Sequence, residues 1–361
     1  MQEAPSKKHF LALDGLRGVA AFAVMLFHIR GVVPAFQFFN SAYLAVDFFF
    51  ILSGFVIDYA YTSRLQTRLS IVGFAKIRVI RLFPLIFAGA SLGALVIIIG
   101  RGWLHLGQWS NLVSYPFALL ALPVPAFLAS QPFSINGPAW SLFFELVANV
   151  VFALLLFRLS VRQLIFFAVL LAVAYCWMGY SNLTIDNGSD RQTFYFGFTR
   201  VAFPFLMGVI IARLHGAYSD LLVVPFWLSA SILLAIFSCT PSPQWRWLFE
   251  ELNVVIVFPL LVSGSRQTLV RGRWGSIAAA SGFLSFPLYI LHWPLLQIAN
   301  FANARAGFAS LTWLPPAMVA TVGIAWIAGF LDERFRAVVM SRIKGRPSPL
   351  ASAAVAQSVR M

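Results

Sequence analysis

The chain has 361 residues, of which 60% are hydrophobic and only 11% are charged, against roughly 25% charged residues in soluble domains. This composition excludes an ordinary soluble protein and predicts an all-α membrane protein. The formal net charge is +14, but the basic residues lie between apolar runs, which is typical of membrane topology signals rather than of a nucleic-acid-binding surface.

Ten apolar segments are long enough, at about 20 residues, to cross a bilayer as helices. They cover residues 11–29, 43–61, 82–100, 138–157, 163–180, 193–212, 222–240, 247–264, 276–299 and 313–331. We expect the first segment to be retained as a span rather than cleaved as a signal peptide. Charged and titratable residues interrupt it, and no clean cleavage pattern follows.

Lysine and arginine residues set the orientation of the spans. With the N-terminus inside, most of them fall in the inner segments, so we expect both termini in the cytoplasm. Residues 112–129 are also apolar, but an eleventh span there would invert the charge bias downstream and would contain three prolines. We therefore predict that residues 101–137 form an irregular or re-entrant segment on the outer side. Residues 1–345 are expected to form one membrane domain, and residues 346–361 a disordered tail.

The two cysteines, Cys176 and Cys239, both lie inside apolar runs. This placement favours buried free thiols over a disulfide or a metal site. Because no spacing typical of zinc ligands occurs, we predict no metal.

The first span carries ionisable residues along one side. Arg17 and His28 are 11 residues apart, which is close to three helical turns, so they share a face and lie about 16 Å apart along the axis. Asp14 lies one turn before Arg17 on nearly the same stripe. Each residue alone is compatible with a structural role, Arg17 snorkelling to the surface and His28 as an interfacial histidine. Because intramembrane ionisable residues are costly and mark functional sites, we predict a polar track here.

The second span places carboxylates at matching depths. Asp47 lies near its outer end, at the expected depth of His28, and Asp58 follows 11 residues later at the expected depth of Arg17. From this spacing we predict two ion or hydrogen-bond pairs, His28 with Asp47 and Arg17 with Asp58.

The sequence "KIRVIRLFP" stands at the inner entrance of the third span. Arg78 and Arg81 are three residues apart and share a helical face, and we expect Pro84 in the first turn of that helix. The two arginines fit either ordinary topology signals or a phosphate clamp, since arginine matches phosphate geometry bidentately.

Further polar residues enter from the fourth and ninth spans. Glu145 lies about two turns into the fourth span, with Ser141 one turn above it. Glu145 is expected either to form a helix-packing hydrogen bond or to face His28 and orient it or the acceptor. Tyr289 and His292 lie one turn apart near the outer end of the ninth span, where His292 could also be an interfacial anchor.

These residues form two predicted clusters. The inner, basic cluster comprises Arg17, Arg78 and Arg81 with Asp58, and the outer cluster comprises His28, Asp47, Glu145, Tyr289 and His292. A basic mouth favours a phosphorylated ligand, and a histidine with a carboxylate can serve as a general base. Acyl-coenzyme A fits such a track, with its phosphates inside and its thioester at His28. Arg200, deep in the sixth span, is expected to face the interior without an assigned partner.

Five sequence blocks, in order, carry a resemblance to a known family. "LDGLRGVAAFAVMLFH" resembles the arginine–x10–histidine motif of the integral membrane acyltransferase-3 family. The blocks "AVDFFFILSGFVI", "RVIRLFP", "GPAWSLFFE" and "LSFPLYILHWPL" resemble its other characteristic blocks. The resemblance covers residues 11 to about 331. Phe286 departs from the serine–tyrosine pair that relatives often show before the proline, but the departure leaves His292 intact.

The resemblance implies ten transmembrane helices. It also implies transfer of an acyl group from acyl-CoA to a hydroxyl of an extracytoplasmic glycan or glycolipid. Acetyl-CoA is the expected donor, and a succinyl or longer acyl group is the open alternative. It implies that Arg17 and His28 are the essential pair and that Arg78 and Arg81 contact the coenzyme. It carries Asp47, Glu145, Tyr289 and His292 over as site residues. A multi-pass protein of the bacterial inner membrane is expected.

Two mechanisms remain open at this point. His28 would act as the general base on the acceptor hydroxyl, or it would take the acyl group transiently as a nucleophile. Arg17 would stabilise donor phosphates or developing negative charge. A proton-coupled exporter is the alternative function, because it also places His and Asp along a membrane track. Inverted repeats, expected of an exporter, are not evident in the sequence.

Overall fold

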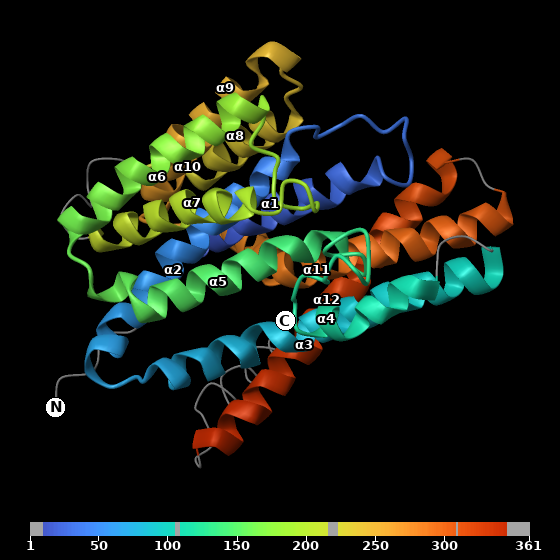
Figure 1. Ribbon diagram of the computed structural model, residues 1–361, viewed down its shortest axis with the longest axis horizontal. Helices are drawn as coiled ribbons and strands as arrows, with labels where there is room; N and C mark the ends of the chain where they lie inside the picture. Colours follow the sequence, from blue (N-terminus) through green and yellow to red (C-terminus); the bar gives the residue numbers. More distant parts are fainter. Residues whose placement is uncertain (1–9, 105–108, 216–222, 308–309, 345–361) are drawn as a thin grey trace.

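The computed structural model describes residues 10–104, 109–215, 223–307 and 310–344, and within these residues it is helical without a strand (Figure 1). This confirms the predicted all-α membrane class. The predicted tail of residues 346–361 lies outside the described residues, so the domain boundary stays a prediction.

Each of the ten predicted spans corresponds to a helical segment. The segments are α1 (Leu11–Ile29), α2 (Ala45–Thr67), α3 (Ile71–Leu104), α5 (Trp140–Leu154), α6 (Val161–Asn182), α7 (Phe196–Arg213), α8 (Phe226–Ser238), the run of α9 (Arg246–Leu252), η6 (Asn253–Val257) and α10 (Phe258–Ser265), α11 (Gly272–Ala306) and α12 (Ser310–Lys344). Within the described residues, nine segments are long and apolar enough to cross a membrane, whereas α8 has only 13 residues.

Within the described residues, the helices in the connections between these segments are short. They are η1 (Ala42–Leu44), η2 (Trp109–Ser114), α4 (Tyr115–Leu119), η3 (Gly137–Ala139), η4 (Leu156–Arg158) and η5 (Pro243–Trp245). The described part of residues 101–137 therefore holds no eleventh span, as predicted. Its last residues lie against the bundle, because Asn136 Nδ2 donates to the Ile290 carbonyl of α11 at 2.8 Å. A methyl group on Gly93 of α3 would overlap the Ile135 carbonyl, so the segment also touches α3.

The sequence predicts Pro84 in the first turn of its helix, and this prediction is wrong. The helix α3 begins at Ile71, so Pro84 lies in its interior and Arg78 and Arg81 are themselves helical. Prolines are tolerated inside membrane helices because neighbouring helices and local adjustments satisfy the freed backbone groups.

The helices α1 and α11 form a close parallel pair. A methyl group on Gly15 would crowd Ala278, and one on Gly18 would overlap the backbone of Ser281. Small residues at such positions allow helix backbones to approach closely. Because the register stays constant along the pair, the outer ends meet as well, and His28 lies beside His292.

The helices α2 and α7 form a second close parallel pair. A methyl group on Gly54 would overlap the Phe205 carbonyl oxygen, and one on Gly208 would overlap the Ile51 carbonyl oxygen. Glycine is required at both positions because another helix backbone occupies the space of a side chain.

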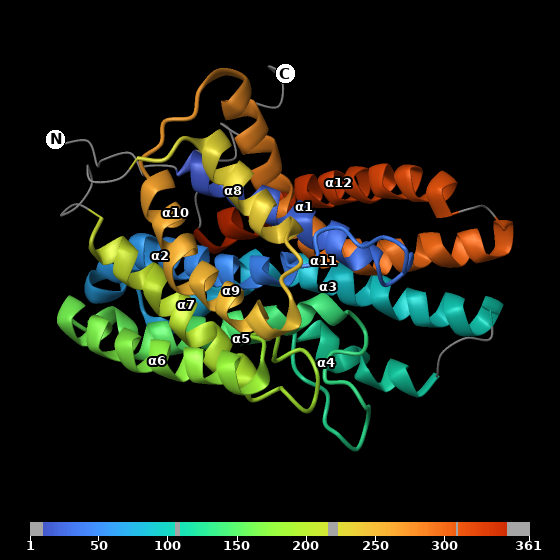
Figure 2. The same cartoon turned by 90° about the horizontal axis from the view of Figure 1, so that it is seen from above.

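The helices α3, α11 and α12 lie side by side and extend beyond the other helices at one end (Figure 2). His292 is 14 residues before the end of α11, which is about 21 Å at 1.5 Å per residue. His28, at the end of α1, and the adjacent His292 therefore lie well below the ends of the long helices.

We expect Gly54→Ala to destabilise the fold, because the added methyl group forces α2 and α7 apart. Overpacking of this kind costs about 1–3 kcal/mol, which a lower thermal unfolding midpoint in detergent would record. Gly323→Ala in α12 is the matched control, since its methyl group would meet no atom within 4 Å. Equal midpoints for the two variants would contradict the close contact.

Candidate active site

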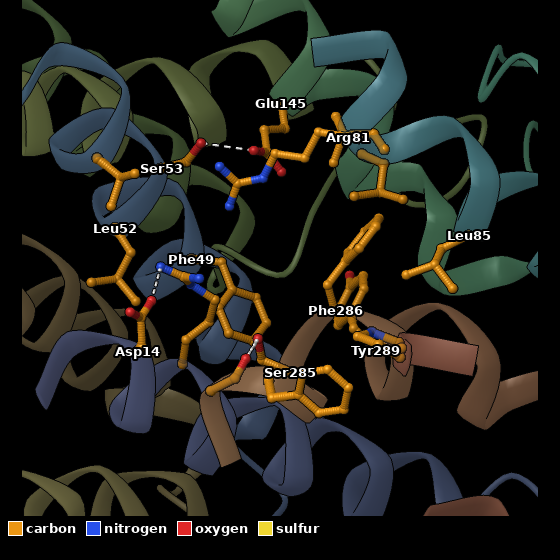
Figure 3. Close-up of a pocket in the computed structure, with 18 of the residues that line it drawn as sticks. Asp14, Phe49, Leu52, Ser53, Arg81, Leu85, Glu145, Ser285, Phe286 and Tyr289 are labelled. Atoms are coloured by element: carbon orange, nitrogen blue, oxygen red, sulfur yellow. Dashed lines mark hydrogen bonds and ion pairs between the residues drawn. The ribbon is translucent and has the colours of Figure 1, made fainter. Parts of the chain in front are cut away.

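A cavity of about 400 Å³ lies among α1, α2, α3, α5, α11 and α12 (Figure 3). Its ionisable lining consists of Arg17, Arg78, Arg81, Arg336, Asp14, Glu145, Asp332 and Glu333. Residues from the start of α1 and from the last third of α12 line it together, so these two ends lie on one side of the bundle. The cavity extends from there to Ser141 and Tyr289.

Arg17 does not pair with Asp58. It forms an ion pair of 3.0 Å with Asp14 of its own helix, while Asp58 accepts hydrogen bonds of 2.7 and 2.8 Å from Nε of Arg213. The predicted pair is wrong because Asp58 faces α7 rather than α1. Asp58 is also absent from the cavity lining in the described part of the chain.

Glu145 belongs to the inner end of the site rather than beside His28. It accepts hydrogen bonds from Ser53 at 2.7 Å and from Arg78 at 3.2 Å. These contacts join α5 to α2 and α3, as a helix-packing hydrogen bonder would. Figure 3 shows Glu145, Ser53 and Arg81 gathered on one side of the cavity, across from Asp14.

The cavity lining is balanced in charge, with four arginines and four carboxylates. Three of the arginines are in ion pairs: Arg17 with Asp14 at 3.0 Å, Arg78 with Glu145 at 3.2 Å and Arg336 with Asp332 at 2.9 Å. Within the described residues, Arg81 forms no ion pair. The sequence predicts an excess of positive charge here, from Arg17, Arg78 and Arg81 with Asp58, but the cavity lining is balanced. Arg81 is the arginine left to meet an anionic ligand.

Tyr289 closes the far end of the cavity. Its hydroxyl donates to the Pro138 carbonyl at 3.0 Å and accepts from the Ser141 hydroxyl at 2.7 Å. Its ring lies 5.5 Å from the ring of Phe49 and 6.1 Å from that of His292, centroid to centroid. Neither His28 nor His292 is among the described residues that line the cavity, so this cluster separates the cavity from the histidines.

His28 pairs with His292 rather than with Asp47. Its Nδ1 lies 2.9 Å from the Val24 carbonyl oxygen and 3.1 Å from Nε2 of His292. Nδ1 of His292 lies 3.0 Å from the Leu288 carbonyl oxygen. The predicted proximity of the two histidines is thus present, but the predicted carboxylate partner is not.

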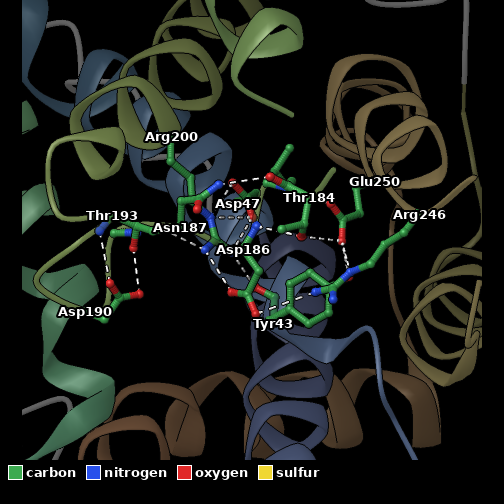
Figure 4. Close-up of polar contacts among 12 residues, drawn as sticks. Tyr43, Asp47, Thr184, Asp186, Asn187, Asp190, Thr193, Arg200, Arg246 and Glu250 are labelled. Carbon is green, nitrogen blue, oxygen red and sulfur yellow. Dashed lines mark hydrogen bonds and ion pairs between the residues drawn. The ribbon is translucent and has the colours of Figure 1, made fainter. Parts of the chain in front are cut away.

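Asp47 is held in a buried ion pair with Arg200, the arginine that had no assigned partner (Figure 4). Both side chains are 0% exposed, and their closest atoms are 3.0 Å apart. Asp47 also accepts from the Tyr175 hydroxyl at 3.1 Å, and Arg200 donates to Asp186 and to the Tyr43 carbonyl, each at 3.1 Å. Asp47 therefore joins α2 to α7, and its carboxylate is not available to His28.

The same network continues to α9. Arg246 donates to the fully buried Glu250 at 2.7 Å. Glu250 also accepts from Tyr43, from Thr184 and from the backbone of Ile185. This carboxylate thus fixes the loop after α6 against the starts of α2 and α9.

The loop between α6 and α7 is also joined to the outer segment. Arg191 donates to three backbone carbonyls within residues 124–130. Partial burial raises the pKa of Asp190, but hydrogen bonds from Thr193 and Gln192 outweigh it and bring the pKa below its usual value. The loop therefore holds a charged aspartate that orders its own turn.

Comparison with known proteins identifies the family. A family model described as an acyltransferase domain, that of the acyltransferase-3 family, matches residues 10–330. The chain belongs to the acyltransferase-3 family. "Protein 2 in picA locus" of Rhizobium radiobacter is 36% identical over 189 residues, covering 48% of this chain and 95% of the relative. "Acyltransferase MdmB" of Streptomyces mycarofaciens is 25% identical over 378 residues, covering 95% of this chain and 94% of the relative. No solved structure matches the chain.

The sequence does not predict the charged network that lies outside the cavity of this acyltransferase-3 protein. Arg213 and Arg246 are among the arginines that the sequence analysis treats together as topology signals, and Glu250 is not among the predicted site residues. Glu250 lies inside an apolar segment and four residues after Arg246, so the cost of an intramembrane charge and the helical spacing were available signals. Asp186 gave no signal, because an aspartate in a polar loop is ordinary.

Asp47→Asn is expected to reduce stability, because it leaves the Arg200 guanidinium buried without its main counter-charge. Breaking a buried pair costs about 3–5 kcal/mol, which would appear as a lower unfolding midpoint and a smaller monodisperse fraction in detergent. Glu333→Gln is the control, since Glu333 is exposed at the cavity mouth and in no ion pair among the described residues. An Asp47→Asn protein of wild-type stability would contradict the structural role.

Proposed function

We propose that this protein transfers an acyl group, acetyl in the first instance, from cytoplasmic acyl-CoA to a hydroxyl of an extracytoplasmic glycan or glycolipid. It would do so in a bacterial inner membrane with both termini in the cytoplasm. The observation that carries the proposal is the cavity that presents Arg81 near its mouth and ends at Tyr289, one turn before His292.

The cavity suits the donor in its arrangement of charge. Arg81 is free of an ion pair within the described residues, and the buried Nε of Arg78 makes no hydrogen bond. Both could donate to phosphate oxygens, which arginine binds in charge-assisted hydrogen bonds. Deeper in, the lining includes Leu52, Leu82 and Leu85, so the arm that bears the thioester would pass along apolar side chains.

His28 would carry out the chemistry at the other side of Tyr289. As a base, it takes the proton of the acceptor hydroxyl while the oxygen attacks the thioester carbonyl carbon. The new carbon–oxygen bond replaces the carbon–sulfur bond, and the proton passes to the coenzyme A sulfur. As a nucleophile, the His28 ring nitrogen that would otherwise take the proton would first take the acyl group and then pass it to the acceptor.

Passage of the thioester requires Tyr289 to move. The hydrogen bonds of its hydroxyl with Pro138 and Ser141 hold the ring between the cavity and the histidines. We propose that these contacts break when the donor is bound, which would keep the cytoplasmic cavity and the outer side apart between turnovers.

The proposal is tested by acyl transfer in reconstituted vesicles. Radiolabelled acetyl-CoA is supplied to one face and an envelope glycan extract to the other. We expect label in the glycan fraction with wild type and none with His28→Ala, because the variant lacks the only proposed base. Equal transfer by folded His28→Ala would overturn the mechanism, and no transfer by wild type would overturn acetyl-CoA as donor.

Arg81→Gln is expected to raise the KM for acetyl-CoA. Loss of one charge-assisted hydrogen bond costs about 1.5–3 kcal/mol, which corresponds to about a 10- to 150-fold weaker interaction. Arg68→Gln is the matched control, because Arg68 is exposed and does not line the cavity among the described residues. A KM that stays at the wild-type value in Arg81→Gln would remove Arg81 from the donor site.

A further inference from the structure

We propose that His292 is the positioning residue for His28, and that a neutral histidine pair takes the place of the histidine–carboxylate pair expected from the sequence. In this pair His292 accepts the Nδ1 hydrogen of His28 and leaves Nε2 of His28 as the reactive lone pair. The inference rests on the proposed function and goes beyond it by assigning the proton positions and the partner.

The hydrogen-bond partners determine which nitrogens carry hydrogen. A carbonyl oxygen can only accept, so Nδ1 of His28 must donate to Val24 and Nδ1 of His292 must donate to Leu288. A neutral imidazole has one ring hydrogen, so Nε2 of both rings is a bare acceptor. The one Nδ1 hydrogen of His28 is then shared in a three-centre hydrogen bond, between the Val24 carbonyl oxygen at 2.9 Å and Nε2 of His292 at 3.1 Å.

The opposite assignment fails at two contacts. If His292 donated from Nε2 to His28, both Nδ1 atoms would lack hydrogen. Each would then place a lone pair against a carbonyl oxygen, at 2.9 Å from Val24 and 3.0 Å from Leu288. Only the first assignment gives every contact a donor and an acceptor.

The rest of the fold keeps this pair in place. The close packing of α1 and α11 through Gly15 and Gly18 sets the register that brings the two rings together. His292 is fully buried, and its own Nδ1 contact fixes its ring. Asp47, the carboxylate partner that the sequence predicts for His28, is committed to Arg200.

In the reaction, the acceptor hydroxyl proton moves to Nε2 of His28 as the acceptor oxygen bonds to the acyl carbon and the carbon–sulfur bond breaks. His28 is then an imidazolium whose Nδ1–H still donates to the lone pair of His292. The Nε2 proton next passes to the coenzyme A sulfur, which restores the neutral pair. His292 neither gains nor loses a proton, and no buried carboxylate is needed at rest.

The test compares His292→Leu with His292→Gln in the vesicle assay. The Gln side-chain oxygen can accept from Nδ1 of His28, whereas Leu has no acceptor. We expect His292→Leu to lose about 100-fold in kcat, a loss at the lower end of general-base contributions, at an unchanged KM for acetyl-CoA. His292→Gln should keep most of the activity. Equal losses in both variants, or a loss confined to KM, would overturn the positioning role.

A second readout does not depend on activity. In protein labelled with 15N-histidine, we expect His28 to show a protonated Nδ1 and a bare Nε2, with a scalar coupling from Nδ1 to Nε2 of His292. A protonated Nε2 on neutral His28 would overturn the pair. If this spectrum is seen but wild type transfers no acetyl group, the proposed function fails alone. If wild type transfers and His292→Leu keeps full kcat, the pair fails alone.

Discussion

Two glycine-mediated helix contacts determine the rest of the structure. Without Cβ atoms at Gly18 of α1 and Gly54 of α2, the backbones of α1 and α11, and of α2 and α7, come into direct contact. In the absence of a hydrophobic force between helices in lipid, such packing is a main source of association. A contact this close permits one register only, so the polar residues farther along each pair have fixed partners.

The two helix pairs use their polar residues differently. Along α2 and α7, two aspartates meet two arginines, Asp47 with Arg200 and Asp58 with Arg213. The Asp47–Arg200 pair is fully buried and the Asp58–Arg213 pair is partly buried, and both satisfy charges within the protein. Along α1 and α11, the outer end brings together His28 and His292, both without a carboxylate partner among the described residues. The α2–α7 pair is thus a rigid support, and the α1–α11 pair carries groups that can exchange protons.

The sequence predicts helices and faces but not neighbours. Helical periodicity places Arg17 and His28 on one face and Asp47 and Asp58 on another, and the structure agrees. Periodicity contains no information on which helix lies opposite, so both pairs between these faces were wrong. Arg213 had the appearance of a topology signal because it ends its span, yet it is the partner of Asp58. Glu145 was placed by depth alone, whereas its rotamer directs it to Arg78 and Ser53.

The balanced charge of the cavity bears on turnover as well as on binding. Free coenzyme A carries the same phosphates as acyl-CoA, so any contact with the phosphates holds substrate and product equally and does not favour the transition state. A cavity with four unopposed arginines would bind the product strongly and slow its release, a step that limits many enzymes. Among the described residues, three of the cavity arginines pair with carboxylates, which leaves Arg81 for the phosphates. On the proposed function, discrimination between donor and product then falls to the deep end, where the thioester meets Tyr289 and only the acylated form has a group to pass on to His28.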